Sequence, residues 1–209
     1  MATQVVMMSS INFCSNLPSL PFELTYATGG VLDGSLLICG GERSKSCYIY
    51  EKTSNAWKFL TYTNTSRYRD SEAATVTNGA LLLTGGFYGI DLSITEFIFS
   101  NGSIIRGPDM PTPRSKHCMV TLDDGRVMIL GGERPNSKNV LIFHPKNKTF
   151  TDGPNLNYGR YDAACTVFVS PLHGNKPMVL SAGGYEQITA EILDYTNTSA
   201  SWQNSKCIT

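Results

Sequence analysis

A Gly-Gly pair that closes an apolar run recurs four times, and this repeat constrains the fold more than any other feature of the sequence. The second glycines are 45, 46 and 52 residues apart, and the longest spacing contains an inserted loop, SPLHGNKP. A fixed period of this length is typical of architectures in which each period forms one supersecondary unit. Because glycine has no side chain, such a pair permits a close approach of neighbouring backbone. The pairs are Gly40 and Gly41, Gly85 and Gly86, Gly131 and Gly132, and Gly183 and Gly184.

The remainder of each period aligns in the same phase. An aromatic residue follows each glycine pair, and in three periods a second ring follows seven positions later; a turn-rich stretch with an arginine comes next. We expect these rings to fill the space between repeated units. They are Tyr50, Trp57, Phe99, Phe143, Phe150, Tyr195 and Trp202.

Each period predicts four short antiparallel strands, here named a to d in chain order. In the third period these are HCMVTL, RVMILG, NVLIFH and TFTD, and Asp-Asp-Gly at 123–125 suits the a–b hairpin. Strand b is apolar nearly throughout, as a strand covered on both faces should be. Four strands in 40–50 residues form a propeller blade. The sequence thus predicts an all-β chain with blades at about 22–62, 70–107, 115–153 and 161–206.

The pattern resembles the kelch repeat, in which an apolar run, Gly-Gly, a tyrosine strand and a tryptophan follow one another. GGERSKSCYIYEKTSNAW and GGYEQITAEILDYTNTSASW match it best. The resemblance implies a β-propeller like those of kelch-like adaptors and of the central domain of galactose oxidase. Such propellers usually close with five to seven blades, so four blades predict a partial propeller, an open arc. Residues 1–21 would hold an orphan outer strand and a linker, and the open end blades would favour self-association.

One loop face is the predicted binding surface, because b–c and d–a loops emerge at the same end of every blade. Arginines and tyrosines gather in these loops, and both residue types anchor protein interfaces. By resemblance to the kelch-like adaptors, arginines of the d–a loops would grip an acidic peptide. The alternative is that the arginines hold blades together by bonding loop carbonyls or nearby carboxylates. The predicted contact residues are Arg43, Arg67, Tyr68, Arg114, Arg134, Arg160 and Tyr161.

Composition argues against several other functions. Lys plus Arg and Asp plus Glu both total 17, so no net charge favours nucleic acid, and no apolar run is long enough to span a bilayer. His117, His144 and His173 share no metal-ligand spacing, and no cofactor or catalytic motif is present. We therefore predict a non-enzymatic protein-binding module without cofactor or metal. The alternatives are a secreted propeller that binds glycans or matrix, and a galactose-oxidase-like copper enzyme, which needs a tyrosine–cysteine cross-link.

Cysteines and glycosylation sequons bear on the compartment. Cys39 and Cys47 bracket the b–c loop of the first repeat, where paired strands would place them opposite each other for a disulfide. Cys118 and Cys165 lie in phase in strand a and are expected to be buried thiols. Sequons at Asn64, Asn101, Asn147 and Asn197 favour an extracellular protein, whereas the opening residues lack the basic start of a signal peptide and favour the cytoplasm.

Overall fold

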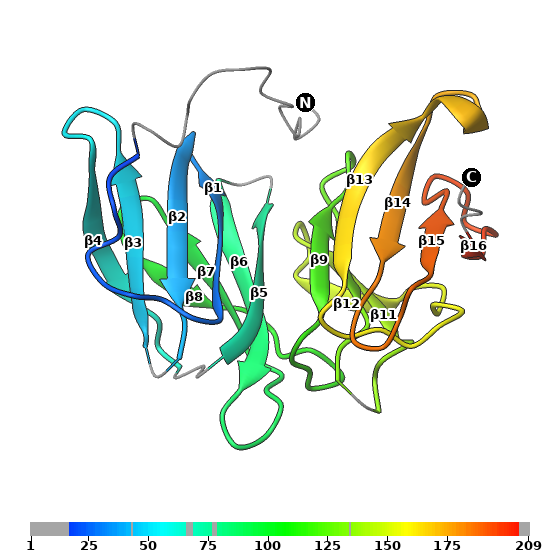
Figure 1. Cartoon of the computed structure of the whole chain (residues 1–209), viewed down its shortest axis with the longest axis horizontal. Coiled ribbons are helices and arrows are strands. Elements are labelled where there is room, and N and C mark those ends of the chain that lie inside the picture. Colours follow the sequence, from blue (N-terminus) through cyan, green and yellow to red (C-terminus); the bar gives the residue numbers. More distant parts are fainter. Residues whose placement is uncertain (1–16, 43, 66–68, 77–78, 134, 205–209) are drawn as a thin grey trace.

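The protein is a β-propeller arc of four blades, each a four-stranded antiparallel meander (Figure 1). The computed structural model describes residues 17–42, 44–65, 69–76, 79–133 and 135–204. Blades 1 and 2 comprise β1 (Ala27–Leu32), β2 (Ser35–Gly40), β3 (Ser46–Glu51) and β4 (Ala56–Tyr62), then β5 (Arg69–Val76), β6 (Ala80–Phe87), β7 (Thr95–Phe99) and β8 (Ile104–Arg106). Blades 3 and 4 comprise β9 (Cys118–Thr121), β10 (Val127–Leu130), β11 (Val140–His144) and β12 (Thr149–Asp152), then β13 (Ala164–Ser170), the 3-10 turn η2 (Pro171–His173), β14 (Lys176–Ala182), β15 (Ala190–Leu193) and β16 (Gln203–Asn204).

The blades follow one another around an arc. Their first strands, β1, β5, β9 and β13, contact each other in turn, and the fourth strands lie on the outside (Figure 1). Blade 1 stands at one end of the arc and blade 4 at the other, and the sheets do not close into a ring. The predicted all-β, four-bladed partial propeller is confirmed. The orphan strand expected within residues 1–21 falls mostly outside the described residues.

Three apolar cores lie between successive blades, and the apolar b strands explain how they form. In β6, Leu81 and Leu83 face the core shared with blade 1, whereas Ala80 and Leu82 face the core shared with blade 3. Alternate side chains of a strand point to opposite faces, so one apolar strand supplies both cores. Each fully buried leucine contributes about 1.5–3 kcal/mol. Blades 3 and 4 share the third core.

Aromatic pairs of strands c and d seal these cores at their outer side. Phe143 stands opposite Phe150 in the β11–β12 ladder, with ring centroids 4.9 Å apart. Tyr50 and Trp57 form the equivalent pair in blade 1, at 5.7 Å. Trp202 is buried between blades 3 and 4, and its Nε1 donates a hydrogen bond to the carbonyl of Pro154 at 2.8 Å. The predicted rings of blades 2 to 4 thus lie in or against the cores between blades, Phe99 and Tyr195 among them. Tyr50 and Trp57 belong to none of these three cores, and Trp57 Nε1 donates a hydrogen bond to the Pro18 carbonyl at 3.1 Å.

Two of the glycine pairs, Gly85–Gly86 and Gly131–Gly132, lie where the backbone of the next d–a loop crosses the end of strand b. Gly86 N donates to the Arg114 carbonyl at 3.0 Å, and Gly132 N donates to the Arg160 carbonyl at 3.0 Å. A Cβ on Gly85 or Gly131 would collide with these same carbonyl oxygens. All the glycines of the pairs also have positive φ, which most other residues adopt at a cost. The repeat therefore marks backbone contacts between blades.

Candidate functional site

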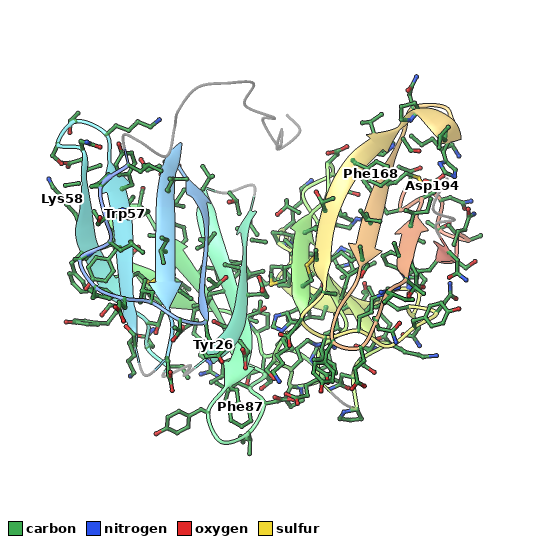
Figure 2. All side chains as sticks on the ribbon, viewed as in Figure 1. Tyr26, Trp57, Lys58, Phe87, Phe168 and Asp194 are labelled. Atoms are coloured by element: carbon green, nitrogen blue, oxygen red, sulfur yellow. A yellow bond between two sulfur atoms is a disulfide. The ribbon has the colours of Figure 1, made fainter. Side chains whose placement is uncertain are left out.

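The b–c and d–a loops converge at one end of the blades, which we call the loop face. It comprises the described parts of residues 41–45, 63–68, 88–94, 107–117, 131–139, 153–163 and 183–189, with residues 25–26 that lead into β1 beside the first of these loops. Figure 2 labels Tyr26 and Phe87 at this end, below the strands of the first two blades. The a–b and c–d connections form the opposite end, called the turn end below. The b–c and d–a loops, which the sequence predicted to share one face, thus lie at one end of the blades.

Arg160 is not available to a partner, because it is 1% exposed and fully engaged within the protein. Its guanidinium donates to the carbonyls of Gly183 and Thr189, each at 2.7 Å. It also donates to the Glu191 carboxylate at 3.0 and 3.1 Å. Glu191 is itself buried and accepts hydrogen bonds from the backbone of Asn157 and Tyr158. Arg160 therefore holds the d–a loop of blade 3 against blade 4.

Arg114 occupies the equivalent place one blade earlier and is 0% exposed. It donates to the carbonyl of Gly131 at 2.9 Å and to the Oδ1 of Asn139. Burial lowers the pKa of Arg114 to about 10, although the charge of Asp152 opposes the shift. For these two arginines the structure supports the alternative drawn from the sequence, in which they bond loop carbonyls and hold blades together.

The other predicted contact residues have different outcomes. Arg43, Arg67, Tyr68 and Arg134 lie outside the described residues. Tyr161 is half-buried and stacks on Tyr185, with ring centroids 5.2 Å apart and planes 16° apart. The Lys116 ammonium lies 5.4 Å above the Tyr161 ring and pairs with Glu133 at 3.2 Å. Tyr161 thus belongs to a mixed aromatic and charged cluster on the loop face.

Exposed apolar side chains on the loop face were missed by the sequence analysis. Tyr26, Tyr88, Ile90, Tyr185 and Ile188 project from the loops, and Ile188 is fully exposed. The signal that could have found them is their position: large apolar residues inside turns that have no core to cover. Tyr88 and Ile90 protrude because the bridge between Phe87 and Asp91 closes their loop at its base. This is the lowest loop of blade 2 in Figure 1.

The loops that carry these residues are tied to one another. Lys116 N donates to the Asp70 carbonyl, and Asp162 N donates to the Lys116 carbonyl, both at 3.0 Å. All three residues have positive φ, from 54° to 61°, so the same strained backbone recurs at the start of β5 and just before β9 and β13. Ser115 Oγ also donates to Asp91 at 2.6 Å, joining a d–a loop to a b–c loop. These bonds hold the described parts of neighbouring d–a loops, and the b–c loop of blade 2, against one another.

Two disulfides stabilise the arc. Cys39 is bonded to Cys47 across the β2–β3 ladder, with Cα atoms 4.1 Å apart, which confirms the predicted bridge. The expectation of buried thiols at Cys118 and Cys165 is wrong, because these residues form a disulfide between β9 and β13. Equivalent positions of neighbouring first strands face each other around the axis, here with Cα atoms 6.1 Å apart. Their matching phase in the repeat was the overlooked signal.

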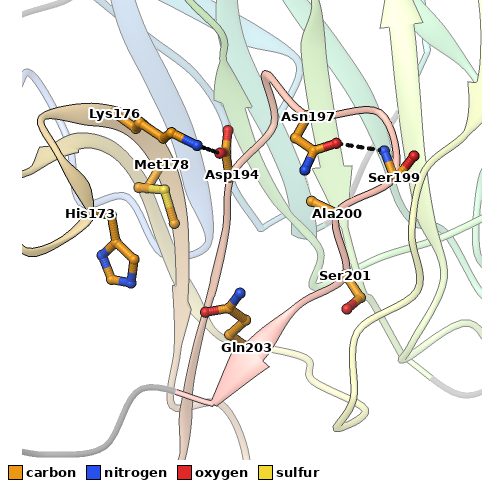
Figure 3. Close-up of a pocket in the computed structure, with 9 residues that line it drawn as sticks. All are labelled: His173, Lys176, Met178, Asp194, Asn197, Ser199, Ala200, Ser201 and Gln203. Atoms are coloured by element: carbon orange, nitrogen blue, oxygen red, sulfur yellow. Dashed lines mark hydrogen bonds and ion pairs between the residues drawn. The ribbon is translucent and has the colours of Figure 1, made fainter.

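A polar hollow of about 430 Å³ lies at the turn end of blade 4 (Figure 3). Lys176 pairs with Asp194 at 2.8 Å on its rim. Hydrogen bonds from Lys176 and Thr196 lower the pKa of Asp194 to about 2. The lining residues are His173, Lys176, Met178, Asp194, Asn197, Ser199, Ala200, Ser201 and Gln203.

The histidines are separate from one another and bonded to hydroxyl groups. His117 is buried, and its Nε2 lies 2.7 Å from Thr84 Oγ1. Burial, assisted by the charge of Arg114, lowers the pKa of His117 to about 3, so this imidazole is neutral near pH 7. Within the described ranges, no three His, Cys, Asp or Glu side chains are grouped to hold a metal ion. The same residues include no helix long and apolar enough to cross a membrane.

Comparison with known proteins shows which of them share this architecture. No family model matches the chain. Galactose oxidase of Gibberella zeae is 36% identical over 81 residues, which is 37% of this chain and 12% of the enzyme; a second curated galactose oxidase from this fungus matches equally well. The matched segment thus spans only a small part of those relatives. The solved structure of YjhT, a kelch-type propeller, superposes with a TM-score of 0.77 at 14% identity and covers 92% of this chain and 67% of YjhT.

The sequence repeat, the four meander blades and the similarities to galactose oxidase and YjhT all indicate the same fold. They concern the architecture, since the identity to YjhT is low and the galactose oxidase match is short. The chain has a kelch-type, galactose-oxidase-like β-propeller fold.

Proposed function

We propose that the chain is a protein-binding module that receives a peptide or protein on its loop face. The observation that carries this proposal is the set of exposed apolar side chains there, contributed by blades 1, 2 and 4: Tyr26, Tyr88, Ile90, Tyr185 and Ile188. Aromatic and aliphatic groups exposed on rigid loops bury large areas on binding at little cost in conformational freedom.

The charged groups of the loop face indicate which chemistry a partner would need. With Arg114 and Arg160 buried, the basic group beside the tyrosine stack is Lys116, and Glu133 pairs with it. The cluster therefore offers both signs of charge around aromatic rings. We expect a partner segment that presents an apolar or aromatic anchor flanked by polar groups. The preference for an acidic peptide that the sequence predicted now depends on Arg43, Arg67 and Arg134.

The test is selection of peptides from a displayed library on the immobilised chain, followed by affinity measurements on variants. Tyr185→Ala combined with Ile188→Ala should weaken the selected peptides at least tenfold, about 1.4 kcal/mol. Leu172→Ala is the matched control, because Leu172 is 79% exposed but lies in η2, at the turn end of blade 4. Equal affinity for the loop variant and the unchanged chain would contradict the proposal.

A galactose-oxidase-like activity is the second candidate, and the short match to galactose oxidase favours it. The described residues do not fit a copper site of that kind: they include no cluster of three metal ligands. Their four cysteines form disulfides and so are not free to cross-link to tyrosine. Copper stoichiometry and hydrogen peroxide release from galactose test this candidate, and stoichiometric copper with turnover would displace the binding proposal.

A further inference from the structure

Three N-glycosylation sequons occupy the same structural position in consecutive blades. Asn101 lies in the connection between β7 and β8, Asn147 between β11 and β12, and Asn197 between β15 and β16. All three are exposed. They are c–d turns, so all three belong to the turn end. The repeat thus presents the same acceptor motif at one end of three neighbouring blades.

The local geometry is also shared. The Oδ1 of Asn101 accepts a hydrogen bond from Ser103 N at 2.9 Å, and the Oδ1 of Asn197 accepts one from Ser199 N at 3.0 Å (Figure 3). In the third turn, Thr149 Oγ1 donates to the Oδ1 of Asn147 at 2.9 Å. Each bond joins the asparagine to the serine or threonine that completes its sequon. In all three turns the bond engages Oδ1, not Nδ2, the atom that would carry a sugar.

We propose that Asn101, Asn147 and Asn197 are N-glycosylated, and that the glycans cover the turn end. The co-substrate is a glycosyl diphosphate carried on a lipid. A bond forms between the asparagine Nδ2 and the anomeric carbon, and the bond from that carbon to the phosphate oxygen breaks. The diphosphate leaves, and the amide nitrogen loses one proton. The exposed turns accommodate the added sugars without displacing core side chains.

The disulfides provide an independent argument for this modification. Cys39–Cys47 and Cys118–Cys165 form and persist in an oxidising compartment, and the secretory pathway is where sequons are also modified. At Asn197 the first sugar would lie beside the polar hollow lined by Lys176 and Asp194 (Figure 3). Hydroxyl groups of a sugar suit such a surface.

The arrangement has a consequence for binding. Glycans on the three turns lie at the opposite end from the loop face and leave it accessible. Asn64 differs, since it follows β4 in a d–a connection and its carbonyl accepts a bond from Lys45 Nζ at 3.1 Å. We do not include Asn64 in the proposal. The inference stands without the proposed binding function, because it concerns other residues and another end of the molecule.

The experiment directs the whole chain into a eukaryotic secretory host behind a cleavable leader. Intact mass is measured before and after peptide N-glycosidase F, and the released sites are identified by ¹⁸O labelling of the resulting aspartates. We expect labelled sites at Asn101, Asn147 and Asn197. Asn101→Gln, Asn147→Gln and Asn197→Gln should each remove one glycan.

Matched variants separate modification from folding. Ser103→Ala and Ser199→Ala keep the asparagine but destroy the sequon, so each should also lose one glycan. Ser103→Thr and Ser199→Thr keep the sequon, so each variant should retain its glycan. An unlabelled asparagine in secreted, disulfide-bonded protein overturns the assignment for that turn, and absence of all three labels overturns the proposal. Peptide binding by the same samples tests the loop face separately.

Discussion

Blades 2 and 3 meet around Arg114, and blades 3 and 4 meet around Arg160, yet the two buried arginines are neutralised differently. Each bonds the carbonyl of the first glycine in the next blade's pair, Gly131 or Gly183. Arg160 also meets the buried carboxylate of Glu191, whereas Arg114 meets the neutral side chains of Thr112 and Asn139. Both arginines therefore bond a glycine carbonyl of the next blade, but they differ in the side chains that meet their charge.

The strand register shows why the two junctions diverge. Glu191 stands opposite Ser181, two residues before the first glycine of its pair. The same place in blade 3 belongs to Leu141, opposite Ile129. Leucine extends the apolar core between blades 2 and 3 but leaves Arg114 without a carboxylate. A buried ion pair and a set of neutral acceptors are thus alternative ways to hold one arginine at a blade junction.

The largest predicted effect comes from removing one member of the ion pair. Arg160→Met leaves the Glu191 carboxylate buried without its cation, and we expect a loss of about 3–5 kcal/mol in the free energy of unfolding. Arg114→Met leaves only neutral acceptors unpaired, which costs about 1–3 kcal/mol. Urea denaturation of both variants measures the difference.

The double variant Arg160→Met with Glu191→Leu imitates the leucine of blade 3 and removes both charges. It should recover at least half of the loss caused by Arg160→Met alone. If Arg160→Met and Arg114→Met cost the same, or if the double variant is no better than the single one, the contrast between the two junctions fails.

The disulfides give the next largest effect, because among the described residues the bridge at the junction of blades 3 and 4 links two blades, whereas Cys39–Cys47 lies within blade 1. Cys118 and Cys165 are 47 residues apart, and Cys39 and Cys47 are 8 apart. On the loop-entropy model, the longer loop contributes about 4 kcal/mol and the shorter one about 2.5 kcal/mol. Cys118→Ser with Cys165→Ser should therefore lower stability more than Cys39→Ser with Cys47→Ser.

Thermal unfolding under non-reducing conditions measures both double variants. The reverse order would show that Cys39–Cys47 protects a weaker part of the arc, and that the junction at Arg160 depends little on its covalent link.

The sequence was sufficient to predict the fold because the fold is periodic. Glycine pairs, apolar b strands and rings seven residues apart each recur, so chance agreement was small. Cys39 and Cys47 were predictable for a local reason: they bracket one short hairpin. Cys118 and Cys165 were not recognised as partners, because their contact depends on how neighbouring blades stand side by side.

The orientation of the loop residues was harder to predict, since a loop arginine has the same sequence context whether it faces solvent or a carbonyl. Arg114 and Arg160 point inward because the glycine pairs leave carbonyls there to accept their bonds. Tyr88 and Ile188 point outward because their turns cover no core. Neither outcome is encoded in residue type; both follow from three-dimensional packing.

The smallest effect sharpens the contrast at the junction of blades 2 and 3, where a second charge lacks compensation. Glu72 lies in β5, two residues before Ala74 of that core, and burial with the charge of Asp162 raises its pKa to about 7. Between its ordinary value of 4.5 and about 7, the folded protein binds more protons than the unfolded chain, so stability falls as pH rises through this window.

Glu72→Gln removes this pH dependence of stability. Because Glu72 is only half-buried, we expect the variant to gain roughly 1–2 kcal/mol over the unchanged chain at pH 8 and almost nothing at pH 4. Urea midpoints at both pH values measure the gain, with Glu23→Gln, an exposed carboxylate, as control. A gain of the same size at pH 4 would mean that packing, and not an uncompensated charge, limits this junction.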